Sequence, residues 1–151
     1  MQLITSSWQD WMKYAHSDPH VLSTRNLIDT DSKAYSLLLC WNPVKESPIH
    51  DQPSDGSWVK LSKGLFKRYR QLGKSKDSSL YCYQESTARA GDVTYIDDTQ
   101  SFHKVGNPVS HISATLHLYS PPALQCKTWP TESGMPLDAC MKNYSEYSRK
   151  I

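Results

Sequence analysis

The chain has 151 residues, four cysteines and a formal net charge of +2 with neutral histidines. A chain of this length fits one domain and can bury enough surface to fold without disulfides. The small net charge produces no strong field toward nucleic acid, and no stretch approaches the roughly 18 apolar residues of a membrane span. We therefore expect one domain over residues 1–151 that binds neither nucleic acid nor membrane.

The first predicted element is a short amphipathic helix over residues 5–16. Its apolar side chains follow the i, i+3, i+4, i+7 spacing of one helix face, at Trp8, Trp11, Met12 and Ala15. The segment lacks the basic start and the long apolar run of a signal peptide. Cysteines without a secretory context favour reduced thiols, and none of the four forms a C-x-x-C pair. We expect a cytoplasmic protein with free cysteines.

Short strands follow the helix. They are predicted over residues 34–41, over 58–70 as two strands joined by a tight turn at Gly64, and over 79–86, 93–97 and 112–120. Short strands with turns at about 8–12-residue intervals favour a sandwich or a barrel over a parallel sheet. Beyond Pro122 the pattern weakens, and residues 123–151, irregular as far as the segment at 141–150, indicate a cover over one end.

Three of the six histidines are candidates for a metal site or a ligand pocket, and three are not. His16, His20 and His111 lie next to turns and are interpreted as solvated. His50 is different, because an H-x-H pair on a strand places two side chains on one face, where they can bind one metal ion. Here Gln52 takes the second position, and its neutral amide oxygen is a weaker ligand than imidazole.

Two further histidines are open to two interpretations each. His103 follows the strand after Gly91, in a predicted turn that could return it to the pocket of His50, or it is a surface group. His117 alternates with Thr115 and Tyr119, so the three side chains face one side of a strand. His117 is then either a hydrogen-bonded core histidine or part of a pocket in which Tyr119 supplies a phenol donor.

Several segments, taken together and in this order, resemble one family. They are residues 23–29, 38–41, 48–52, 95–98, 102–107 and 116–122, with Cys126 beyond them. The T-R-N-L segment at 24–27 and the L-H-L-Y-S-P-P segment at 116–122 are the most specific. The sequence is identified as a member of the cysteine dioxygenases, the cupin-fold thiol dioxygenases. The resemblance runs from about Trp8 to Cys126 and implies an all-β, antiparallel, jelly-roll-like cupin barrel with a short N-terminal helix.

The resemblance also implies a metal site. The family binds ferrous iron through three histidines, and His50 and His103 correspond to the first and third of them. Gln52 stands where the second belongs. Asp55, three residues later, could supply a carboxylate instead, which would give the two-histidine, one-carboxylate set that suits non-haem iron.

The substrate side of the site is implied in the same way. Arg25 corresponds to the arginine that pairs with the substrate carboxylate, a task that suits the two parallel donors of a guanidinium. Tyr119 and His117 correspond to the pocket tyrosine and its histidine partner. Ser57 takes the place of the cysteine that animal members crosslink to the tyrosine, and Ser23 stands where a tyrosine is typical.

The predicted function is an iron-dependent thiol dioxygenase of cysteine metabolism, acting as a monomer. It would use O₂ to oxidise cysteine, or a related small thiol with a carboxylate, to the sulfinate. The alternative is a catalytically impaired relative that binds a metal or a small thiol without turnover. Gln52 is the main support for the alternative, and the sequence leaves both readings open.

Overall fold

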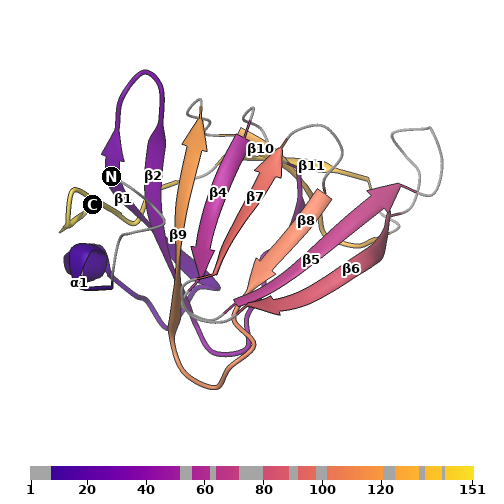
Figure 1. Cartoon of the computed structure of the whole chain (residues 1–151), viewed down its shortest axis with the longest axis horizontal. Coiled ribbons are helices and arrows are strands. Elements are labelled where there is room, and N and C mark those ends of the chain that lie inside the picture. Colours follow the sequence, from indigo (N-terminus) through magenta and orange to yellow (C-terminus); the bar gives the residue numbers. More distant parts are fainter. Residues whose placement is uncertain are drawn as a thin grey trace.

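The computed structural model describes residues 8–51, 56–61, 64–71, 80–88, 92–97, 102–120, 125–132, 135–140 and 142–151. These residues form two sheets (Figure 1). The seven-stranded sheet has the order β13-β12-β1-β2-β9-β4-β7, and the six-stranded sheet has the order β11-β10-β3-β8-β5-β6. Within these ranges every named strand pair is antiparallel except β1 with β12.

The strand bounds are as follows. The first sheet holds β1 (Ser23–Thr30), β2 (Tyr35–Trp41), β4 (Gly56–Leu61), β7 (Val93–Asp97), β9 (Ser113–Ser120), β12 (Ser145–Glu146) and β13 (Arg149–Lys150). The second holds β3 (Ile49–His50), β5 (Gly64–Gln71), β6 (Leu80–Ala88), β8 (Phe102–Gly106), β10 (Gln125–Trp129) and β11 (Leu137–Cys140).

Strand β2 lies in the middle of the first sheet and is buried along its whole length. Its alternate side chains enter two different cores, because successive side chains point to opposite faces. Leu37, Leu39 and Trp41 pack with Val59 and Val105 between the sheets, whereas Leu38 and Cys40 belong to a second cluster with Trp11. A continuous apolar run is therefore required here, as the sequence predicted.

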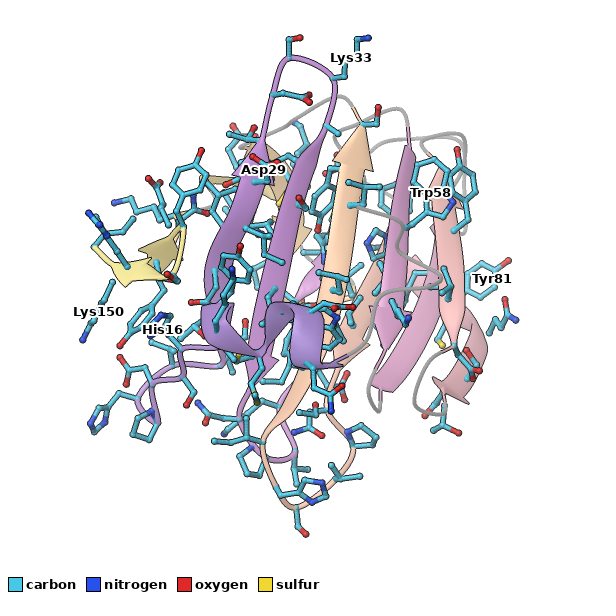
Figure 2. The ribbon with its side chains drawn as sticks, turned by 60° about the vertical axis from the view of Figure 1, so that its left-hand side comes forward. His16, Asp29, Lys33, Trp58, Tyr81 and Lys150 are labelled. Carbon is cyan, nitrogen blue, oxygen red and sulfur yellow. The ribbon has the colours of Figure 1, made fainter. Side chains whose placement is uncertain are left out.

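The N-terminal helix covers the outer face of the first sheet and ends earlier than predicted, at Tyr14. It consists of α1 (Trp8–Trp11) and a 3₁₀ turn, Met12–Tyr14, and it lies across β1 and β2 (Figure 2). Trp11 is buried as expected, but Met12 is 51% exposed, so Met12 does not belong to the packed face. A tighter 3₁₀ turn rotates the apolar positions away from α-helical spacing, which explains the difference.

Two sequence predictions about pairing were wrong. Residues 58–70 do contain parts of two strands, but β4 and β5 lie in different sheets and form no hairpin. The segment before residue 141 is not irregular, because its described residues include β10 and β11. In both places the strands pair with distant partners, which local periodicity does not reveal. The other predicted strands are confirmed as β2, β6, β7 and β9.

Within the described ranges, no helix is long and apolar enough to cross a membrane. The all-β, antiparallel prediction with a short N-terminal helix is confirmed. The assignment of residues 1–151 to one domain stays a prediction.

Candidate functional site

A cavity of about 190 Å³ lies between the two sheets. Its walls come from Arg25 on β1, His117 and Tyr119 on β9, and His50 on β3. A larger hollow of about 500 Å³ lies beside α1 and is lined by Asp10, Asp29, Asp31 and neighbouring residues. It holds none of the predicted site residues, so the smaller cavity is the candidate site.

His50 lines this cavity, and His103 packs against the His50 ring without lining the cavity itself. They are directly opposite in the β3–β8 register, and their ring centroids are 4.1 Å apart with an interplanar angle of 66°. His103 is buried in β8, not in the turn that the sequence predicted. The reason is the strand period of two, since His103 and Val105 face inward while Phe102 and Lys104 are only half-buried.

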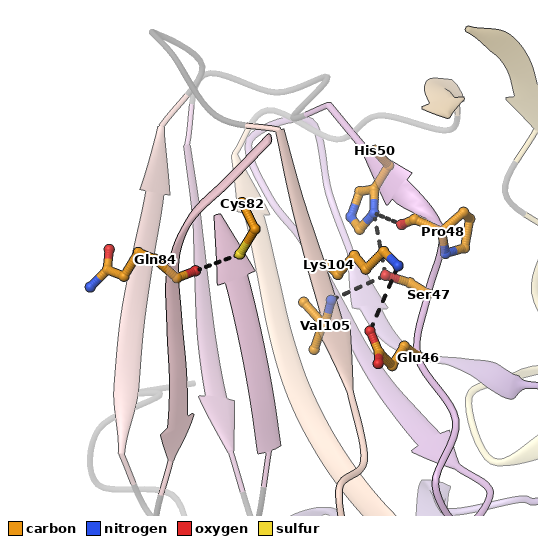
Figure 3. Close-up of polar contacts among 8 residues, drawn as sticks. All are labelled: Glu46, Ser47, Pro48, His50, Cys82, Gln84, Lys104 and Val105. Carbon is orange, nitrogen blue, oxygen red and sulfur yellow. Dashed lines mark hydrogen bonds and ion pairs between the residues drawn. The ribbon is translucent and has the colours of Figure 1, made fainter. Parts of the chain in front are cut away.

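The hydrogen-bond partners of the His50 ring place its proton on Nδ1. Nδ1 lies 3.0 Å from the carbonyl oxygen of Pro48 and 3.5 Å from Oγ of Ser47 (Figure 3). A carbonyl oxygen only accepts, so Nδ1 carries the proton and Nε2 keeps its lone pair. Burial lowers the pKa of His50, which keeps the ring neutral. This is the form of imidazole that binds a metal.

Ser47 joins the segment before His50 to β8. Its hydroxyl oxygen accepts a hydrogen bond from the amide of Val105 at 3.1 Å, and its own amide donates to the Val105 carbonyl at 2.8 Å. Figure 3 shows this contact beside the His50 ring. These two hydrogen bonds therefore join the segment that carries His50 to the strand that carries His103.

These residues fit a divalent metal ion such as Fe²⁺ as far as the structure describes them. Two imidazoles at directly opposite positions of paired strands are suitable ligands for such an ion. Gln52 and Asp55, the candidates for the next ligand, lie outside the described residues. Among the residues that are described, no group of three His, Cys, Asp or Glu side chains could hold a metal.

A hydrogen-bonded chain runs along the opposite wall. Trp41 Nε1 donates to Thr115 Oγ1 at 2.8 Å, Thr115 Oγ1 lies 2.7 Å from His117 Nε2, and His117 Nδ1 lies 3.3 Å from the Tyr119 hydroxyl. Burial lowers the pKa of His117 to about 3, with Arg25 and His50 acting in the same direction. His117 is therefore both a hydrogen-bonded buried histidine and a cavity residue.

Tyr119 and Arg25 face one another in the same cavity. Burial raises the pKa of Tyr119, while the charge of Arg25 and a hydrogen bond from it act to lower that pKa. The phenol therefore stays protonated and can donate. The Nε and Nη2 atoms of Arg25 are buried and have no hydrogen-bond partner in the described protein. Buried guanidinium N–H groups without protein partners suit an incoming anion.

The comparisons with known proteins decide the family. The sequence model of cysteine dioxygenase type I matches residues 1–132 of this chain. The chain belongs to the cysteine dioxygenase family. Cysteine dioxygenase type 1 of Danio rerio is 32% identical over 155 residues, covering 99% of this chain and 76% of the relative. The enzyme of Rattus norvegicus is 30% identical over 151 residues, covering 97% of this chain and 74% of the relative.

Solved structures support the cupin fold of this family. A conserved Klebsiella pneumoniae protein with a double-stranded β-helix domain has a TM-score of 0.56 at 13% identity, covering 91% of this chain and 96% of that chain. An oxalate oxidase has a TM-score of 0.54 at 16% identity, covering 80% and 61%. These likenesses concern the fold alone. The predicted cupin architecture and the dioxygenase class of oxidoreductase are confirmed.

Cysteine dioxygenase family membership directs attention to several positions around the cavity. Ser23 and Cys126 both line it. Position 57 lies opposite Tyr119 in the β4–β9 register, whereas the side chain of Ser57 is outside the description. Trp41 and Ser47 were missed by the sequence reasoning. Trp41 alternates with Leu37 and Leu39 on the inward face of β2, a signal that could have placed it near the site.

Proposed function

We propose that this chain is an iron-dependent thiol dioxygenase that oxidises cysteine, or a related small thiol with a carboxylate, to the sulfinate. One observation carries the proposal: the unpartnered, buried N–H groups of Arg25 lie in the same cavity as His50, His117 and Tyr119. A guanidinium in that position would bind a carboxylate through two parallel hydrogen bonds. A thiol without a carboxylate would leave those groups unpaired.

The size of the cavity supports a small substrate. Sites for drug-sized ligands enclose about 300–1,000 Å³, and this cavity of about 190 Å³ is below that range. His50 and His103 would hold the metal, with Gln52 as a third candidate ligand. When bound, Fe²⁺ would supply the activation of O₂ that an organic side chain does not provide.

The chain's own residues orient the reactants. Arg25 holds the carboxylate, which directs the thiol sulfur toward the side of the cavity that His50 lines. Tyr119, kept protonated by its raised pKa, donates a hydrogen bond into the cavity. His117 holds that hydroxyl in place through Nδ1.

The reaction balances without a further reductant. A thiolate, R–S⁻, combines with O₂ to give R–SO₂⁻, so two sulfur–oxygen bonds form and the oxygen–oxygen bond breaks. Sulfur is oxidised and O₂ is reduced. The thiol proton leaves to solvent when the thiolate forms.

Metal analysis of the purified protein, followed by oxygen uptake with cysteine, 3-mercaptopropionate and cysteamine, tests the proposal. We expect stoichiometric oxygen uptake, sulfinate as the product, and a preference for the two carboxylated thiols. Gln52→His should raise both iron content and rate, because imidazole is a stronger donor to ferrous iron than an amide oxygen. A Gln52→His protein that binds iron and oxidises none of the three thiols would support the binding-protein alternative. A cytoplasmic location and a monomeric state stay predictions of the sequence.

A further inference from the structure

The C-terminal hairpin, residues 143–150, lies against the strand that carries Arg25. Its first strand, β12, runs parallel to β1, with Ser145 opposite Asn26. The amide of Tyr144 donates to the carbonyl of Arg25 at 2.7 Å, and the amide of Tyr147 donates to the carbonyl of Leu27 at 2.9 Å. The hairpin thus bonds the backbone on both sides of Asn26, including Arg25 itself.

Asn26 ties this hairpin to the rest of the protein. It is fully buried on the face of β1 opposite to Arg25. Its Oδ1 accepts a hydrogen bond from the Ser145 hydroxyl at 2.6 Å. Its Nδ2 donates to the carbonyl of His16 at 3.1 Å and to the carbonyl of Leu38 on β2 at 3.2 Å.

Two further contacts fasten the hairpin. Nε2 of His16 lies 3.0 Å from the carbonyl of Ser148 (Figure 2 shows His16 beside the hairpin strand of Lys150). The hydroxyl of Tyr35 donates to Oδ1 of Asn143 at 2.8 Å. Tyr35 is on β2 and lies opposite Tyr119 of β9 in the β2–β9 register, so the hairpin is bonded to the strand that carries Arg25 and to the neighbour of the strand that carries Tyr119.

The residues of the hairpin follow residue 132, the last residue matched by the family model. We propose that Asn26 and the hairpin act together as a positioning device for Arg25, with Ser145 as the residue that joins them. The device determines how well the cavity discriminates a thiol with a carboxylate from one without. This inference rests on the proposed function, in which Arg25 binds the carboxylate.

The test compares the binding of two ligands to the iron-loaded full-length protein without oxygen. L-Cysteine carries a carboxylate and cysteamine does not. Ser145→Ala removes the donor to Asn26, and it should weaken cysteine binding by about three- to tenfold while cysteamine binding stays unchanged. A merely structural role would lower the melting temperature and affect both ligands alike, so the ratio of the two dissociation constants is the readout.

One control variant and one second test variant complete the comparison. Ser36→Ala changes another buried serine, whose hydroxyl donates to the carbonyl of Asp29 at 3.2 Å, and it should leave the ratio unchanged. Tyr35→Phe removes only the hydroxyl that bonds to Asn143, and it should change the ratio in the same direction by a smaller factor. If Ser145→Ala does not fold, Tyr35→Phe decides.

Arg25→Ala separates the two proposals. If it abolishes the preference for cysteine while folded Ser145→Ala and Tyr35→Phe both retain the wild-type ratio, the positioning device is refuted and the proposed function stands. If Arg25→Ala leaves the preference intact, or if the wild-type protein binds neither ligand, the proposed substrate role fails and the inference fails with it.

Discussion

At the scale of single residues, burial decides the protonation of the cavity. His117 stays neutral in the folded protein down to a pKa of about 3, against an ordinary value of 6.5. Between these two pH values the unfolded chain binds more protons than the folded chain. The free energy of unfolding must therefore fall as the pH is lowered from about 6.5 toward 3. The contribution of neutral His117 to that free energy is fully present above about pH 6.5.

This gives a prediction for His117. In the wild-type protein, the titration of His117 should make the free energy of unfolding rise with pH by up to about 1.4 kcal/mol per pH unit between roughly pH 4 and 6. His117→Gln retains a hydrogen-bonding side chain but does not titrate, so the slope should become shallower. Urea unfolding at several pH values measures it. An unchanged slope in the variant would show that His117 is protonated in the folded protein.

The residue scale also shows where sequence reasoning succeeded. The strand period placed Thr115, His117 and Tyr119 on one face, and the structure bonds them to one another. The sequence could not predict the hydrogen bond from Trp41 to Thr115, because the two residues are 74 positions apart and come together only through the β2–β9 pairing. His16, interpreted as solvated, is half-buried for a similar reason, since its partner Ser148 is 132 positions away.

At the scale of elements, the turn of the C-terminal hairpin is strained. Tyr147 and Ser148 have φ angles of 52° and 68°, in the left-handed region that costs an L-residue roughly 1–2 kcal/mol. Two-residue hairpin turns of this kind favour glycine or asparagine. The contacts of the hairpin with His16 and β1 hold this conformation in place.

Ser148→Gly should therefore stabilise the protein. The gain should be about 0.5–1 kcal/mol, because relief of the left-handed strain exceeds the entropy that glycine loses on folding. The acceptor for His16 is the backbone carbonyl, which the substitution keeps. Denaturant titration measures the change. Ser32→Gly, at an exposed serine without a positive φ, is the matched control and should destabilise slightly or leave the value unchanged.

Strand β2 yields a second prediction at this scale. Leu38 is fully buried in the outer cluster with Trp11, Ile28 and Leu116. Leu38→Ala should reduce the free energy of unfolding by about 2–5 kcal/mol through lost burial and a residual cavity. Leu137→Ala, at a position 57% exposed, should change it by less than about 0.5 kcal/mol. Equal effects would contradict the assignment of a packed core beneath the N-terminal helix.

At the scale of the whole molecule, strands with a strong apolar or alternating pattern were predictable, whereas β1, β3, β8, β10 and β11 and the partners of all strands were not. The apolar run of β2 and the alternation of β9 are local signals, and both strands formed as predicted. The separation of β4 and β5 into different sheets depends on which partners complete each sheet, a non-local property. The resemblance of specific segments supplied the cupin fold that periodicity alone left open between sandwich and barrel.

The buried N–H groups of Arg25 have a consequence for the thermodynamics of the whole chain. The described protein offers these donors no acceptor, so any small carboxylate that enters the cavity binds the folded state and not the unfolded one. Acetate or formate in a buffer should then raise the melting temperature in a concentration-dependent way. Ligand at about 100 times its dissociation constant would add roughly 2.7 kcal/mol. Arg25→Met should remove this dependence on the anion. The apparent stability of this protein is thus a function of its buffer, and melting temperatures are comparable only at a fixed carboxylate concentration.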